Sequence, residues 1–103
     1  MRRLIASALG PAGFDVELAS DGVEALYRLE GGRHDAVVLD LVMPGIDGLE
    51  VCRRARERGA RVPILVVTAD TEGAAHAVEA GADDVLAKPF GLEELERRVR
   101  ALL

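Results

Sequence analysis

Segments with a helical pattern and segments with an extended pattern alternate strictly along this chain, and this order restricts the fold more than any other feature. Apolar residues recur at helical spacing in several segments, namely residues 4–9, 20–31, 48–58, 71–80 and 91–102. Short extended segments lie between them, namely residues 14–19, 36–39, 62–67 and 84–87. Strict alternation of helices with strands predicts an α/β protein whose parallel strands are joined by right-handed helical crossovers.

Two of the extended segments are uncharged and apolar throughout, which is the pattern of strands buried on both faces. Residues 36–39 and 62–67 carry only Ala, Val, Ile, Leu and one Pro, whereas residues 14–19 alternate between apolar and acidic side chains. Strands that are apolar on both faces are typical of parallel sheets covered by helices on both sides. The sequence therefore predicts a doubly wound sheet, in which functional groups lie beyond the carboxyl ends of the strands.

The composition narrows the class of protein. The chain has 103 residues, the size of one small domain, and 50% of them are hydrophobic. Its longest apolar run, residues 62–67, is too short to cross a membrane, and its net charge of -5 argues against general binding to nucleic acids. The single cysteine, Cys52, cannot form an internal disulfide and suits a reducing compartment. We therefore expect a cytoplasmic, single-domain protein with no membrane segment and no direct contact with nucleic acid.

Three of the predicted strands lead into polar side chains of complementary chemistry, Asp40, Thr68 and Lys88. Because the carboxyl ends of parallel strands meet at one edge of a sheet, we expect a carboxylate, a hydroxyl and an ammonium group to lie together there. A carboxylate can attack phosphorus to form an acyl phosphate, and the other two groups can hold phosphoryl oxygens. Taken singly, each residue also has an ordinary structural interpretation, as a loop-capping Asp, a strand-forming Thr and a solvated Lys.

Three sequence blocks around these residues resemble the receiver domain of bacterial two-component response regulators. The blocks are Val37–Gly48, Pro63–Ala69 and Gly81–Phe90. The resemblance runs through the whole chain and implies a flavodoxin-like fold whose strands lie in the order 2-1-3-4-5. It also implies that the protein is a signalling module and not an enzyme.

The resemblance implies a role for each residue at the strand ends. Asp40 would be the phosphoacceptor for a sensor histidine kinase in a histidine-to-aspartate phosphorelay. Thr68 and Lys88 would bind the phosphoryl group, and Lys88 would precede a cis peptide bond to Pro89. Mg²⁺ would be held by Asp40 and the main-chain carbonyl of Val42, together with an acidic residue of the family.

The first residues depart from the family pattern. Receivers open with a strand that runs into a pair of acidic residues, whereas this sequence begins at Met1 within the pattern of the first helix. We therefore expect a receiver over residues 1–103 that is incomplete at its N-terminus, with strand 1 missing. Weak binding of Mg²⁺ and impaired phosphorylation of Asp40 are the expected chemical consequences. The expected structural consequence is that the gap left by strand 1 in the sheet is filled in one of three ways. The strand at residues 14–19 shifts to pair with residues 36–39, two chains pair or exchange strands as a homodimer, or the true start of the protein lies upstream.

A second departure is Val85, the position at which many receivers carry a Tyr or Phe that changes its rotamer on phosphorylation. A valine packs at such a position but has no ring to swing, which weakens the expectation of the usual coupling to Thr68.

The remaining candidate residues have structural interpretations that compete with functional ones. Asp47 fits a helix cap as well as it fits a signalling role, and Asp83 and Asp84 predict a solvated turn in preference to a metal-binding pair. His34 and His76 are predicted to be exposed, and Cys52 is predicted to be a buried core residue. A solvated helix face is predicted for the arginine row, Arg53, Arg54, Arg56, Arg58 and Arg61.

The leading functional prediction is a stand-alone receiver with no output domain, which acts on an unknown downstream protein. The alternative is a pseudo-receiver that works through protein contacts and never takes phosphate. A phosphohydrolase with an aspartate nucleophile would need a second Asp where Val42 stands. A flavin-binding flavodoxin would need a Ser/Thr-rich phosphate loop before its first helix, which this sequence lacks.

Overall fold

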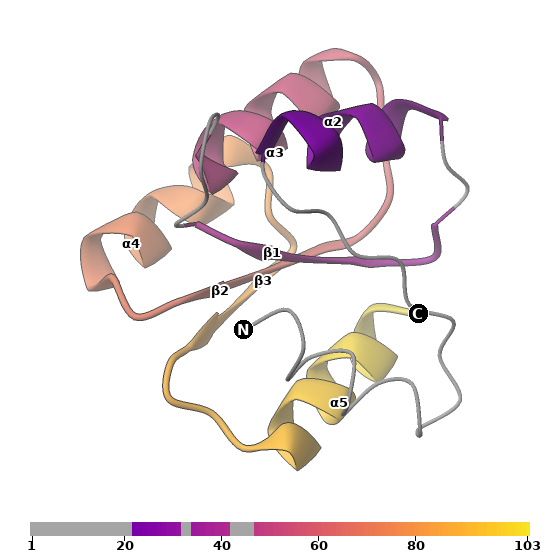
Figure 1. The fold of residues 1–103 in the computed structure, drawn as a ribbon. Coiled ribbons are helices and arrows are strands. Elements are labelled where there is room, and N and C mark those ends of the chain that lie inside the picture. Colours follow the sequence, from indigo (N-terminus) through magenta and orange to yellow (C-terminus); the bar gives the residue numbers. More distant parts are fainter. Residues whose placement is uncertain (1–21, 32–33, 42–46) are drawn as a thin grey trace.

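Three parallel strands form a sheet with helices on both of its faces (Figure 1). The computed structural model describes residues 22–31, 34–41 and 47–103. Within these residues the elements are α2 (Gly22–Gly31), β1 (Val37–Asp40), α3 (Gly48–Glu57), β2 (Ile64–Thr68), α4 (Thr71–Ala80), β3 (Asp84–Ala87) and α5 (Leu92–Leu102). The predicted helix at residues 4–9 and the predicted strand at residues 14–19 lie outside the described residues.

The strands lie side by side in the order β1-β2-β3, and both neighbouring pairs are parallel. In the register of the first pair Asp40 lies opposite Val67, and in that of the second Thr68 lies opposite Ala87. This order agrees with the last three strands of the expected 2-1-3-4-5 arrangement. The predicted flavodoxin-like, doubly wound fold is confirmed.

The central strand β2 separates two apolar clusters. All of its residues are buried, and the side chains of successive residues point to opposite faces. On one face, Ile64 and Val66 belong to a cluster with residues of α3 and α4, while on the other Leu65 and Val67 pack against Leu95 of α5. Figure 1 shows the corresponding layers, with α2, α3 and α4 on one side of the sheet and α5 on the other. Burial of each such side chain stabilises the fold by roughly 1.5–3 kcal/mol.

Strand β2 begins two residues later than the apolar run predicts. Pro63 has no N–H to donate to a ladder, although its carbonyl accepts a 2.9 Å hydrogen bond from the Val37 N–H. The carbonyl of Val62 accepts a 2.8 Å hydrogen bond from the Arg56 guanidinium and is not available to a strand ladder. Regular pairing therefore starts at Ile64.

Helices α3 and α4 each begin with an aspartate cap. Asp47 accepts a hydrogen bond from the Glu50 N–H at 2.9 Å, and Asp70 accepts one from the Glu72 N–H at 3.0 Å. A side-chain oxygen at this position satisfies one of the unpaired N–H groups of the first turn. Helix α4 ends at Gly81, whose φ of 111° lies in the left-handed region that glycine adopts at little cost.

The predicted solvated arginine row is wrong at one position, Arg56. Its guanidinium donates to the carbonyls of Gly81 and Ala60 at 2.9 Å and to that of Val62 at 2.8 Å. It also donates to Asp83 at 2.8 Å. Arg56 therefore joins the end of α3 to the loops that lead into β2 and β3.

The solvated turn predicted at Asp83 and Asp84 is confirmed for Asp83, which is exposed in the bend before β3. Asp84 instead is the half-buried first residue of β3, and both carboxylates have protein partners. Asp83 accepts from Arg56 and from the Ile64 N–H, each at 2.8 Å. Asp84 is paired with Arg98 of α5 at 2.9 Å. Both residues thus fasten the amino end of β3 to its surroundings.

The predictions for Cys52 and His76 are confirmed, whereas the prediction for His34 is wrong. Cys52 is buried, as expected for a core residue, and burial raises the pKa of its thiol. His76 is exposed on α4, whereas His34 is half-buried and not exposed as predicted.

Candidate functional site

The carboxyl edge of the sheet holds the three residues that the strand-end pattern singled out. Asp40 is the last residue of β1, Thr68 is the last residue of β2, and Lys88 follows β3 directly. Since the strands are parallel, all three residues lie at the same edge. The sheet therefore gathers residues that are 20 or more positions apart in the sequence.

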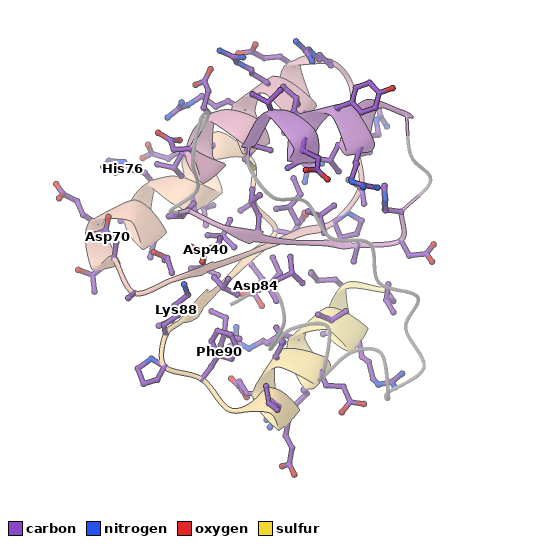
Figure 2. All side chains as sticks on the ribbon, in the orientation of Figure 1. Asp40, Asp70, His76, Asp84, Lys88 and Phe90 are labelled. Atoms are coloured by element: carbon purple, nitrogen blue, oxygen red, sulfur yellow. The ribbon has the colours of Figure 1, made fainter. Side chains whose placement is uncertain are left out.

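Asp40 and Lys88 form an ion pair at this edge. The Nζ atom of Lys88 donates to Oδ2 of Asp40 at 2.7 Å, and the side chains of Lys88 and Asp40 are only 24% and 20% exposed. Figure 2 shows the ammonium group pointing to the Asp40 side chain across the edge of the sheet. A partly buried pair with this geometry is stronger than an exposed one, because water screens it less.

The main chain holds Lys88 beside the central strand. Its N–H donates to the carbonyl of Thr68 at 2.9 Å, which extends the pairing of β2 with β3 by one residue. The peptide bond between Lys88 and Pro89 is cis.

Thr68 lies at the same edge but is held by a different partner. Its side chain is 2% exposed, and its Oγ1 accepts a 2.9 Å hydrogen bond from the Asp70 N–H. A threonine hydroxyl has two lone pairs and one hydrogen, so the hydrogen stays available for donation.

Helix α3 approaches the site closely because its first residue is glycine. A Cβ atom at Gly48 would lie 2.6 Å from the carbonyl oxygen of Asp40 and 2.7 Å from the Cα of Leu41. The Gly48 N–H instead donates to the carbonyl of Leu41 at 3.1 Å. This glycine therefore lets α3 pack on the chain beside Asp40.

The remaining candidate residues are Val42, Val85 and Asp47. Val42 lies outside the described residues. Val85 is half-buried on β3 and packs against the cluster that contains Val66 and the small residues of α4. Asp47 caps α3, which agrees with the structural interpretation of that residue.

The carboxyl edge of the sheet offers oxygen atoms of the kind that Mg²⁺ binds. Among residues 22–31, 34–41 and 47–103, no group of three or more His, Cys, Asp or Glu side chains is arranged to hold a metal ion. Asp40 nevertheless supplies a carboxylate at a half-open position, and Mg²⁺ commonly uses one or two carboxylates together with other oxygen ligands. The residues present therefore fit a magnesium site based on Asp40.

A doubly wound parallel sheet with Asp, Thr and Lys at its carboxyl edge is the arrangement expected of a receiver domain. The chain belongs to this family: it matches the response regulator receiver domain over residues 1–100. Receiver domains of this kind are signalling modules of two-component systems, so the protein is a receiver in two-component signalling.

Individual relatives agree with this assignment. The response regulator MprA of Mycobacterium sp. (strain KMS) is 52% identical over 105 residues, which cover 100% of this chain and 46% of that protein. The receiver domain of the Francisella response regulator 1452 has a TM-score of 0.91 at 32% identity, over 98% of this chain and 85% of that one.

A third relative has a metal ion. The receiver domain of the sensor histidine kinase PA1611 from Pseudomonas aeruginosa PAO1, solved with a magnesium ion coordinated in its active site cleft, has a TM-score of 0.87 at 38% identity. The match covers 97% of this chain and 85% of that one.

The chain spans about half the length of the curated relatives that it matches. None of the helices in the described part of the chain has the length and apolar character that a membrane span requires.

Proposed function

We propose that Asp40 accepts a phosphoryl group from a sensor histidine kinase, and that Thr68 and Lys88 bind this group. The observation that supports the proposal best is the 2.7 Å contact between Lys88 Nζ and Asp40 Oδ2 at the carboxyl edge of the sheet. A carboxylate already paired with an ammonium group has a cation in place for the charge that phosphorylation adds.

In the proposed reaction an oxygen of the Asp40 carboxylate attacks the phosphorus of a phosphohistidine. A new P–O bond forms and the P–N bond breaks, while the imidazole keeps the bonding electrons and is neutralised by a proton. The acyl phosphate brings about -1.5 to -2 charges and three acceptor oxygens to the site. Lys88 offsets part of this charge, and the hydroxyl hydrogen of Thr68 is available for one phosphoryl oxygen.

Asp40 and the main-chain carbonyl of Val42 are the proposed protein ligands of Mg²⁺. A bound divalent cation neutralises charge on the transferring phosphoryl oxygens. The weak affinity for Mg²⁺ and the impaired phosphorylation that the sequence analysis expects stay predictions, as do a homodimer, a cytoplasmic location and an interaction with a downstream protein.

The experiment incubates the protein with phosphoramidate, a small phosphodonor, with and without Mg²⁺, and follows the intact mass with time. We expect a single phosphate to be added slowly in the presence of Mg²⁺ and to be lost at alkaline pH, as an acyl phosphate is. The Asp40→Asn variant is the matched control and should take none. Equal phosphorylation of the variant would refute the assignment of Asp40.

The alternative, a pseudo-receiver that acts through protein contacts alone, makes the opposite prediction. It requires that the wild-type chain takes no phosphate even at saturating phosphodonor and Mg²⁺. The same mass measurement therefore separates the two functions.

A further inference from the structure

Lys88 is the only lysine in the chain. The other 12 of the 13 Lys and Arg residues are arginines. An arginine guanidinium stays protonated in proteins, whereas a lysine amine forms amides with activated acyl groups. A reagent that acylates lysine side chains therefore has one lysine to act on in this protein, and that lysine lies at the proposed phosphoacceptor.

The structure leaves the Lys88 side chain within reach of a small reagent. This side chain is 24% exposed, and Figure 2 shows it at the carboxyl edge of the sheet beside Asp40. The thiol of Cys52, another nucleophile that acyl donors can modify, is fully buried. A small acyl donor that reaches the Asp40 carboxylate also reaches the Lys88 nitrogen, which lies 2.7 Å from it.

An acyl phosphate offers a reactive centre to each of these two side chains. The Asp40 carboxylate can attack its phosphorus, and the Lys88 amine can attack its carbonyl carbon. In the second reaction a C–N bond forms to Lys88, the C–O bond to phosphate breaks, and phosphate leaves with the bonding electrons. The ammonium nitrogen loses two protons, which the leaving phosphate takes up, so atoms and charge balance.

Acylation and phosphorylation both need the side chains of this one pair. An acylated Lys88 is a neutral amide, so the cation that is now paired with Asp40 at 2.7 Å is lost. Phosphorylation would then add its roughly -1.5 to -2 charges without that cation. A phosphoryl group on Asp40 would in turn accept hydrogen bonds from the Lys88 ammonium and cover its nitrogen.

We propose that Lys88 is an acylation site for small acyl phosphates, and that acylation of Lys88 and phosphorylation of Asp40 exclude one another. The exclusion rests on the proposed function of Asp40, whereas the acylation of Lys88 does not. Because the remaining basic side chains of the sequence are arginines and histidines, acylation of lysine in this protein bears on this site alone.

The first experiment measures acylation without phosphorylation. The protein is incubated with acetyl phosphate and EDTA, treated at alkaline pH to remove acyl phosphates and esters, and digested for fragment mass spectrometry. Arg97→Lys supplies a reference amine on α5, where the side chain of Arg97 is 72% exposed and 3.3 Å from Glu94. Far-UV circular dichroism checks that each variant is folded.

The reagent concentration is raised until the reference amine at position 97 is acetylated. We expect an acetyl group on Lys88 under the same conditions, and none at position 88 of the Lys88→Arg variant. An acetylated position 97 beside an unmodified Lys88 would overturn the inference.

The second experiment measures the effect of the acetyl group on phosphorylation. Acetylated wild-type protein is incubated with phosphoramidate and Mg²⁺, and we expect phosphorylation at least about 10-fold slower than that of untreated protein, the effect of one lost charged hydrogen bond. The same acetylation treatment should leave the rate of Lys88→Arg unchanged, because this variant has no amine at the site. Equal rates for treated and untreated wild type would overturn the exclusion.

The third experiment reverses the order. Arg97→Lys protein is phosphorylated with phosphoramidate and Mg²⁺ and is then acetylated. We expect Lys88 to react at least about 5-fold more slowly than in unphosphorylated protein, while position 97 reacts as before. Asp40→Asn with the same pretreatment should show no such protection. Unchanged acetylation of Lys88 would overturn the exclusion, whereas a failure of Asp40 to take phosphate would overturn the proposed function and leave the acylation of Lys88 standing.

Discussion

Arg56 is the residue whose replacement tests the physical reasoning about the fold most directly. Its guanidinium makes hydrogen bonds of 2.8–2.9 Å to Gly81, Ala60, Val62 and Asp83, and its side chain is 24% exposed. The partners at Gly81 and Asp83 lie 25 and 27 positions along the chain. We consider the substitution Arg56→Lys, which keeps the positive charge but replaces a planar fork of donors with a compact ammonium group.

The expected magnitude follows from these contacts. Hydrogen bonds that involve a charged group contribute roughly 1.5–3 kcal/mol each. A lysine ammonium group cannot reach all of the three carbonyls and the Asp83 carboxylate that the Arg56 guanidinium binds. The total loss of stability is smaller than the sum of these contributions, because water can replace some of the lost partners and because neighbouring hydrogen bonds are not additive. We therefore expect Arg56→Lys to lower the free energy of unfolding by about 2–4 kcal/mol. That is a large fraction of the 5–15 kcal/mol of a typical domain.

The assay is urea denaturation followed by far-UV circular dichroism, since the chain has no tryptophan. The matched control is Arg53→Lys on the same helix, where the ion pair to Glu50 is exposed and is worth about 0–1 kcal/mol. If Arg56→Lys destabilised the protein no more than Arg53→Lys does, the assignment of Arg56 as a structural clamp would be refuted.

Three further predictions concern the site and the core. Gly48→Ala places a Cβ 2.6 Å from the carbonyl oxygen of Asp40, so we expect a loss of about 1–3 kcal/mol in urea denaturation. Gly91→Ser, whose Cβ meets nothing within 4 Å, should not be destabilising, and a loss equal to that of Gly48→Ala would contradict the argument. Lys88→Met removes the cation 2.7 Å from Asp40, so Mg²⁺ should bind about 5-fold more tightly in an NMR titration while phosphorylation slows. An unchanged Mg²⁺ affinity would show that Lys88 and Mg²⁺ do not compete for the Asp40 carboxylate. Burial raises the pKa of the Cys52 thiol in the folded protein. The contribution of the neutral thiol to the free energy of unfolding is therefore complete below the ordinary thiol pKa of about 8.5, and it is lost as the pH rises towards the raised pKa of the folded protein. Cys52→Ala should lack this decrease between neutral and alkaline pH, and parallel stability curves for the two proteins would exclude the effect.

Much of the fold could be predicted because it depends on local patterns. Helix α4 over Thr71–Ala80 and strand β3 over Asp84–Ala87 have the predicted bounds, since the glycine at 81 ends the helix and an apolar stretch follows it. The three strand-end residues were predicted to share one edge from the parallel topology alone, and the structure places them there.

The sequence by itself determined the α/β class, the family and the residues at the ends of the strands, because periodicity and short motifs report how each segment is buried. Only the tertiary structure decided which arginine of α3 is a clamp and which aspartate holds Thr68. Arg56 lies on the same helix as Arg53, and it differs because the fold brings Gly81 and Asp83 to it. Contacts between residues far apart in the chain depend on how the elements pack, and no local pattern encodes that distance.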